Sequence, residues 1–256
     1  MPLLLVHLRE EEKGADARLS EVLSYALDGY AYETATEIST LKDYVNRWRR
    51  LEKTQNRKNP VQGRILFAVP LGTSGINLEL YRLIRFLREH PDFLNGFVGG
   101  LLVDSENDLY SKSAAKDLVF AANCAGCAFV GRPLVEGTRT LSNYTIVSNN
   151  LGTDLMGAYR ESAAGLVKEV LGTDCVRKKC PKVLVLHASS HKTSNTYAIW
   201  NRVKEQLPEM EIREIGLRNG TLSDCAGCPY KMCLHFGEQG SCFYGGVMVE
   251  DVYPAV

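Results

Sequence analysis

The first two thirds of the chain alternate between short apolar runs and amphipathic stretches. Apolar runs bounded by polar or glycine-containing turns predict strands at Leu3–Leu8, Tyr32–Ile38, Ile65–Val69, Phe97–Val103 and from Ala128 onward. Apolar residues at helical spacing predict helices at Ala15–Leu27, Leu41–Lys53, Asn77–Arg88, Ser111–Cys124 and Asp154–Val170. We expect an irregular segment at Arg132–Asn150.

Five strands alternating with helices predict an α/β fold with a doubly wound parallel sheet. The natural arrangement for five strands is the flavodoxin-like order 2-1-3-4-5. We therefore expect residues 1–173 to form one flavodoxin-like domain. The loop that follows the first strand is acidic and would repel a phosphate. We expect no flavin site in this domain and a solvated acidic loop from Asp104 to Asp108.

A second domain is expected at residues 182–256, after a short polar and basic linker at residues 174–181. The unbroken apolar run Val183–Leu186 is typical of a strand buried on both faces of a parallel sheet. A second strand is expected at Glu211–Leu217. The first strand is followed by a loop rich in hydroxyl groups and by an amphipathic helix. Free N–H groups and the dipole at a helix start favour an anion, and phosphate is the ligand that this loop suits. The alternative is an ordinary helix cap that binds no ligand.

The segment from Ala188 to Thr196 resembles the phosphate loop of the flavodoxin-like NADPH-dependent FMN reductases and the iron–sulfur flavoproteins. That family carries the pattern Gly-Ser-Pro-Arg-Lys-x-Ser-Asn-Thr after its first strand. This chain has Ala188, Ser190 and His191 in the places of Gly, Pro and Arg, and it matches at Ser189, Lys192, Ser194, Asn195 and Thr196. The resemblance extends over about the last 75 residues. It implies that FMN binds through Ser189, His191, Ser194, Asn195 and Thr196.

Eight cysteines fall in close pairs. Without a secretion signal a disulfide framework is not expected, because cytosolic reductants keep thiols reduced. We interpret Cys124 and Cys127, which end a predicted helix, as buried structural residues. The set Cys225, Cys228, Cys233 and Cys242 lies in one glycine-containing loop and provides four thiolates, which suit a [4Fe–4S] cluster or a structural zinc ion. A loop with free or packed thiols and no metal is a third alternative. The resembling iron–sulfur flavoproteins hold a cluster in this loop.

Composition and charge narrow the class of protein. Thirty basic and thirty acidic residues cancel, so no basic field indicates a nucleic-acid partner or an anionic membrane. The apolar run at the N-terminus is too short for a signal peptide or a membrane span. We expect a cytoplasmic protein that acts on small molecules or on a protein electron acceptor.

The favoured interpretation is an FMN-dependent oxidoreductase. A nicotinamide donor, NADH or NADPH, would reduce the flavin, and the electrons would pass to an acceptor, with a [4Fe–4S] cluster as an optional relay. No general acid or base is required, and no catalytic side chain is assigned. The alternative is a non-catalytic metal-binding or iron–sulfur electron-carrier protein.

The second domain is expected to be incomplete. A flavodoxin-like domain has five strands, whereas residues 182–256 accommodate two. The strand at Val183–Leu186 would then present an unpaired edge, which favours pairing with another chain. We accordingly expect that the chain is the front part of a longer protein or that a partner completes the sheet, and we expect a homo-oligomer. The chain as it stands should bind FMN weakly and show little reductase activity.

Overall fold

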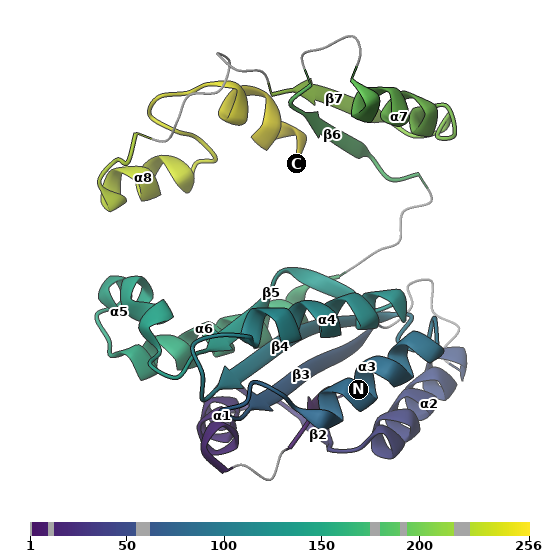
Figure 1. The fold of residues 1–256 in the computed structure, drawn as a ribbon, viewed down its shortest axis with the longest axis vertical. Coiled ribbons are helices and arrows are strands. Elements are labelled where there is room, and N and C mark those ends of the chain that lie inside the picture. Colours follow the sequence, from purple (N-terminus) through teal and green to yellow (C-terminus); the bar gives the residue numbers. More distant parts are fainter. Residues whose placement is uncertain (1, 10–12, 55–61, 175–179, 190–193, 218–225) are drawn as a thin grey trace. The chain divides into compact units, whose positions relative to one another are not determined.

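The computed structural model describes residues 2–9, 13–54, 62–174, 180–189, 194–217 and 226–256. The chain divides into two compact units, Met1–Cys175 and Val176–Val256, and each is described by itself. Figure 1 shows the elements of both units.

The first unit contains a parallel sheet of five strands in the order β2-β1-β3-β4-β5. This order confirms the predicted α/β fold with a flavodoxin-like sheet. The strands are β1 (Leu3–His7), β2 (Tyr32–Ala35), β3 (Gly63–Leu71), β4 (Phe97–Ser105) and β5 (Ala128–Gly137). The helices are α1 (Lys13–Ala26), α2 (Ile38–Thr54), α3 (Leu78–Glu89), α4 (Ser111–Cys124), the 3₁₀ turn η1 (Ser142–Tyr144), α5 (Thr145–Leu151) and α6 (Leu155–Gly172).

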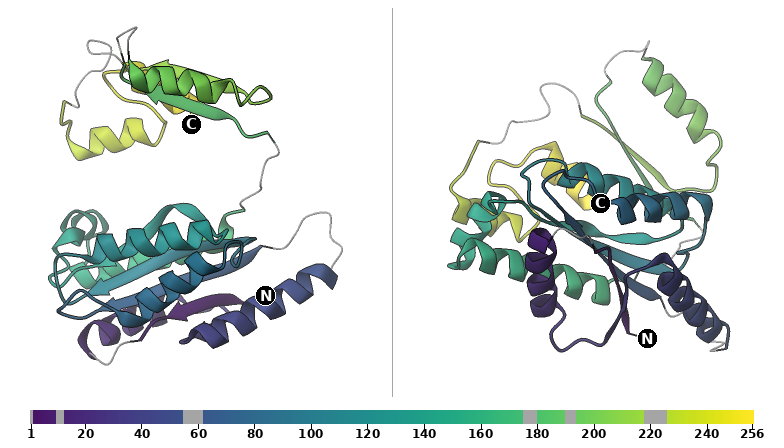
Figure 2. Two further views of the ribbon diagram at one scale, coloured as in Figure 1. Left: turned by 45° about the vertical axis from the view of Figure 1, so that its right-hand side comes forward. Right: turned by 60° about the horizontal axis from the view of Figure 1, so that its bottom comes forward.

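Helices cover both faces of this sheet, which explains why its strands read as continuous apolar runs. Alternate residues of each strand enter two separate hydrophobic clusters. In β3, for example, Phe67 packs in the cluster that includes α2, α3 and α4, whereas Leu66 packs in the cluster that includes α1 and α6. Figure 2 shows the two layers of helices on opposite sides of the sheet.

The fifth strand differs from the prediction. The sequence indicated a short strand followed by an irregular segment at Arg132–Asn150, but β5 continues through Gly137, and α5 begins inside that segment. The pairing of β5 with β4 shifts register between Gly99 and Leu101. This irregularity contains Gly131 and Pro133, which are the residues that make the sequence look like a loop.

The second unit has a parallel sheet of two strands, β6 (Val183–His187) and β7 (Ile212–Gly216). Its helices are α7 (Asn195–Lys204), α8 (Tyr230–Gly237), the π-helical turn η2 (Met248–Val252) and the 3₁₀ turn η3 (Tyr253–Ala255). Among the described residues β6 pairs only with β7. Membership of this unit in a flavodoxin-like domain remains a prediction.

The burial predicted for β6 is wrong. Val183, Leu184 and Val185 are half-buried, and Leu186 is 45% exposed. A strand is buried on both faces only where helices cover both faces of its sheet, and this two-stranded sheet lacks such layers within the described residues. No helix of the described part of the chain is long and apolar enough to cross a membrane.

Candidate functional site

A pocket lies where β6 ends and α7 begins. Its volume is about 530 Å³. The lining residues come from the end of β6, from the loop that follows and from the first turns of α7; they are Val185, Leu186, His187, Ala188, Ser189, Ser194, Thr196, Tyr197 and Trp200. The carboxyl end of a parallel strand next to a helix N-terminus is the usual place for an anionic ligand in α/β proteins.

Ser194 defines the start of α7. Its backbone is extended, and its side-chain oxygen accepts a hydrogen bond from the backbone N–H of Tyr197, 3.2 Å away. This N-cap satisfies one of the helix's free N–H groups and leaves the Ser194 hydroxyl hydrogen available to another acceptor. The local sequence therefore produces a helix start with hydroxyl groups on both sides of the cap.

The residues predicted to bind phosphate are distributed as follows. Ser189, Ser194 and Thr196 line the same pocket. Asn195 is the first residue of α7 and is not among the lining residues. His191 lies outside the described residues, so its predicted role remains a prediction.

Three aromatic residues of this pocket were not predicted as site residues. They are His187, Tyr197 and Trp200. The rings of His187 and Tyr197 lie 4.9 Å apart between centroids and are tilted by 46°. Tyr197 and Trp200 stand at helical spacing, which usually indicates a core-facing stripe, and His187 ends the strand without a recognisable motif. A polar residue at the carboxyl end of a parallel strand was the available signal for His187.

One ion pair joins α7 to β7. Lys204 bonds to Glu214 of β7, and Tyr197 donates a hydrogen bond to the same carboxylate at 3.4 Å. The bond from Lys204 lowers the pKa of Glu214 below its ordinary value. Because Lys204 offsets its charge, Glu214 is a weaker source of repulsion for an anion in the pocket.

The cysteine loop contains a second pocket of the same unit, with a volume of about 540 Å³. Cys228, Cys233 and Cys242 all line it, together with Phe236, Phe243 and Tyr244 among others. The sequence did not predict α8, which lies inside this loop. Cys225 lies outside the described residues. Among those that are described, no three histidine, cysteine or acidic side chains gather in a group that could hold a metal ion.

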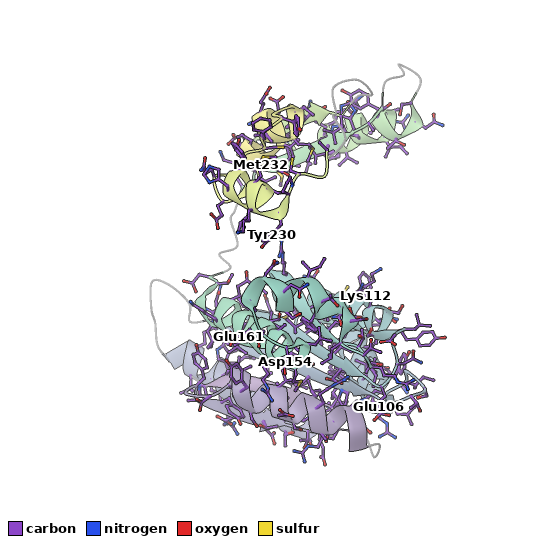
Figure 3. The ribbon with its side chains drawn as sticks, turned by 90° about the vertical axis from the view of Figure 1, so that its left-hand side faces the viewer. Glu106, Lys112, Asp154, Glu161, Tyr230 and Met232 are labelled. Atoms are coloured by element: carbon purple, nitrogen blue, oxygen red, sulfur yellow. The ribbon has the colours of Figure 1, made fainter. Side chains whose placement is uncertain are left out.

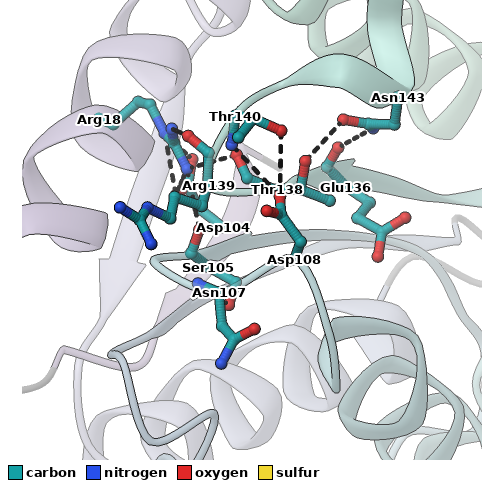
Figure 4. A network of polar contacts seen from close by, with 10 residues as sticks. All are labelled: Arg18, Asp104, Ser105, Asn107, Asp108, Glu136, Thr138, Arg139, Thr140 and Asn143. Carbon is teal, nitrogen blue, oxygen red and sulfur yellow. Dashed lines mark hydrogen bonds and ion pairs between the residues drawn. The ribbon is translucent and has the colours of Figure 1, made fainter.

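The carboxyl ends of β4 and β5 in the first unit carry a network of polar contacts (Figure 4). Arg18 of α1 binds Asp104 through two nitrogens, with Nη2–Oδ1 at 2.7 Å and Nε–Oδ2 at 3.0 Å. Arg18 also donates to the carbonyl oxygens of Ser105, Thr138 and Arg139 at 3.0–3.1 Å. The guanidinium thus ties α1 to the ends of two strands and has its nitrogens engaged within the fold.

Asp104 does not belong to a solvated acidic loop, as the sequence predicted, because its side chain is fully buried. Burial raises the pKa of Asp104, while the bonds from Arg18 act in the opposite direction. Asp108 is exposed and accepts from the backbone N–H and the hydroxyl of Thr140, and this backbone N–H lowers its pKa. These carboxylates have partners from the protein, so the network is structural.

Two cavities of the first unit meet next to this network. Their volumes are about 650 and 460 Å³, and both are lined by Lys112, Glu136 and Asn143. Figure 3 shows the side chains as sticks, with Lys112 labelled. The Glu136 carboxylate accepts a hydrogen bond from the Ser111 hydroxyl and lies 3.8 Å from Lys112 Nζ. Its charge is therefore compensated by groups of the fold.

The prediction for the Cys124–Cys127 pair is half wrong. Cys127 is 1% exposed and is buried, as expected, but Cys124 is exposed. The helix α4 ends at Cys124, and the chain then turns into β5 through Gly126, whose φ of +93° favours glycine. The turn places one thiol outside and the other between the sheet and its helices.

Comparisons with known proteins add no family to this picture. No protein-family model matches the chain, and no curated protein matches it.

Proposed function

We propose that the protein is an FMN-dependent oxidoreductase whose second unit binds the phosphate of FMN in the pocket between β6 and α7. It would take hydride from NADH or NADPH and pass electrons to a small-molecule or protein acceptor. The observation that carries the proposal is that three hydroxyl-bearing residues, Ser189, Ser194 and Thr196, line one pocket at a helix N-terminus. The resemblance of this loop to the FMN reductases supports the same ligand.

The residues of the pocket suit a phosphate ester. Hydroxyl groups donate to phosphate oxygens, and the positive end of the α7 dipole favours their negative charge. The apolar walls of Val185 and Trp200 add surface that is available to a less polar part of the ligand. When bound, FMN supplies the hydride-accepting chemistry. The chain's own contribution is to bind and orient it, and no proton transfer is assigned to any side chain.

The test is the double variant Ser194→Ala with Thr196→Val. We expect it to weaken FMN binding by about 2–4 kcal/mol, because each hydrogen bond to a charged group contributes roughly 1.5–3 kcal/mol and the contributions of neighbouring groups are not fully additive. FMN affinity would be measured by fluorescence titration, after circular dichroism has shown that α7 is retained. Ser39→Ala with Thr40→Val, the same two changes near the start of α2 in the first unit, is the matched control. Equal affinity of the two double variants would contradict the proposal.

The alternative is a metal-binding or iron–sulfur electron carrier. Three cysteines line one pocket, which favours it, but the described residues bring no three ligand side chains together. Absorption spectra of the purified protein, with anaerobic iron, sulfide and zinc analysis, distinguish the candidates. Two visible bands indicate flavin, and one broad shoulder with stoichiometric iron and sulfide indicates a cluster. Zinc without a visible band indicates a structural metal site.

A further inference from the structure

His187 is the one described imidazole in the pocket between β6 and α7. It is the last residue of β6, and its carbonyl oxygen accepts a hydrogen bond from the backbone N–H of Leu217 at 2.7 Å. That bond fixes the backbone at the point where the chain leaves the sheet. The ring is held from the other side by Tyr197 of α7. The imidazole is therefore positioned by two elements in the pocket that Ser189 and Ser194 also line.

The two ring nitrogens of His187 differ in their surroundings. Nδ1 is shielded from solvent and has no hydrogen-bond partner among the described residues. Nε2 also lacks a partner there, but it is not one of the shielded atoms. A buried N–H without an acceptor is rarer in proteins than a buried acceptor without a donor. A proton on Nε2, the nitrogen that remains accessible, leaves no orphaned N–H at Nδ1.

We propose that His187 is a further phosphate-binding residue, which donates a hydrogen bond from Nε2 to the phosphate of the ligand in this pocket. The inference rests on the proposed function and adds a side chain that the loop motif does not contain. It adds a donor from the strand to the hydroxyl-bearing residues of the loop and the helix that line the same pocket. The ligand class is a phosphate monoester.

Two substitutions distinguish the effect of the Nε2 hydrogen-bond donor from the effect of ring packing. His187→Phe retains a flat ring against Tyr197 but removes the donor, whereas His187→Gln places an amide N–H where Nε2 stands. We expect His187→Phe to weaken FMN binding by on the order of ten- to a hundredfold and His187→Gln to retain wild-type affinity within a few-fold. Binding of inorganic phosphate alone, measured by broadening of its ³¹P NMR line, should likewise be weaker in His187→Phe than in His187→Gln and the wild type. His235→Phe, on α8 and outside this pocket, is the matched control.

The possible results distinguish a failure of the proposed role of His187 from a failure of FMN binding itself. Wild-type affinity for FMN in His187→Phe would overturn the role of His187 and leave the proposed function intact. Equal losses in His187→Phe and His187→Gln, with both proteins folded by circular dichroism, would show that the ring acts only by packing and would also overturn it. Absence of FMN binding by the wild-type protein would overturn the proposed function together with this inference. If His187→Phe fails to fold, His187→Asn, whose amide reaches the Nδ1 position, replaces it in the same comparison.

Discussion

At the residue scale, the titratable group with the clearest link to stability is His7, at the end of β1. Its side chain is 4% exposed, and Nε2 lies 2.7 Å from Asp16 Oδ1. Burial lowers the pKa of His7 below its ordinary value of 6.5, and Asp16 offsets only part of that effect. The folded protein therefore holds this imidazole neutral at pH values where the unfolded chain is already protonated.

The consequence is a loss of stability in acid. The unfolded state binds more protons than the folded state below pH 6.5, so the free energy of unfolding should fall as the pH drops through the folded-state pKa. Above pH 6.5 the contribution of His7 should be constant. His7→Gln retains a donor for Asp16 and should flatten this slope, as measured by urea unfolding between about pH 7.5 and pH 5. A slope equal to that of the wild type, or of the control variant His235→Gln, would contradict this account.

Single residues also show what the sequence could not reveal. The hydroxyls Ser189, Ser194 and Thr196 were predicted because a strand, a polar loop and a helix start are local features. The Arg18–Asp104 pair joins residues 86 positions apart and depends on how α1 packs against the sheet. It also needs Gly137, where an added Cβ would lie 2.7 Å from Asp104 Oδ2. Such a contact is decided by tertiary packing, which periodicity does not encode.

At the element scale, Asn77 joins three parts of the first unit. Its side-chain oxygen accepts from the N–H of Leu80 at 2.8 Å and so caps α3. Its amide nitrogen donates to the carbonyl oxygens of Leu8 and Pro70 at 3.1 and 2.9 Å. The side chain is fully buried, so none of these groups can exchange its partner for water. One amide thereby fixes the start of α3 to the ends of β1 and β3.

Asn77→Ala should therefore cost more than the loss of an ordinary cap. We expect about 2–5 kcal/mol, from a lost N-cap of about 1 kcal/mol and two carbonyls that lose a buried partner. The matched control is Asp154→Ala, which removes an exposed cap whose side chain accepts from Gly157 at 2.6 Å and should cost about 1 kcal/mol. Urea unfolding followed by circular dichroism measures both. Equal losses would show that the two buried carbonyl contacts contribute little.

Elements were predicted best where local pattern and packing agree. Helix α4 was predicted with the bounds that the structure has, and α3 and α6 begin one residue after their expected starts, because Asn77 and Asp154 are caps. The helix α8 was not predicted, since four cysteines and several glycines made that segment look like a loop. The exposure of β6 could not be predicted. An apolar run indicates that a strand forms, but it does not show whether helices cover both faces of the sheet.

At the scale of the whole molecule, the two units differ in how much core they contain. The first unit has two hydrophobic clusters, one on each face of its sheet. In the described part of the second unit only Ile215 and Val252 are buried hydrophobic residues, and Phe243, Tyr244 and Ile199 are each at least 59% exposed. A two-stranded sheet with so little buried apolar surface is marginally stable in water. The stability of the chain should therefore reside in the first unit.

This contrast leads to a prediction for the separate parts. Residues 1–175 alone should unfold cooperatively with the main urea midpoint of the whole chain, and residues 176–256 alone should show no cooperative transition. In the whole chain, amides of β6 and β7 should exchange with solvent much faster than those of β3, because the free energy of local opening is small where few apolar contacts are lost. If the proposed function holds, FMN at about a hundred times its Kd should stabilise the second unit by roughly 2.7 kcal/mol and slow exchange there, with β3 unchanged. A cooperative transition of residues 176–256 without ligand would contradict the prediction, and it would mean that the half-buried strands of this unit are held by more than the described contacts.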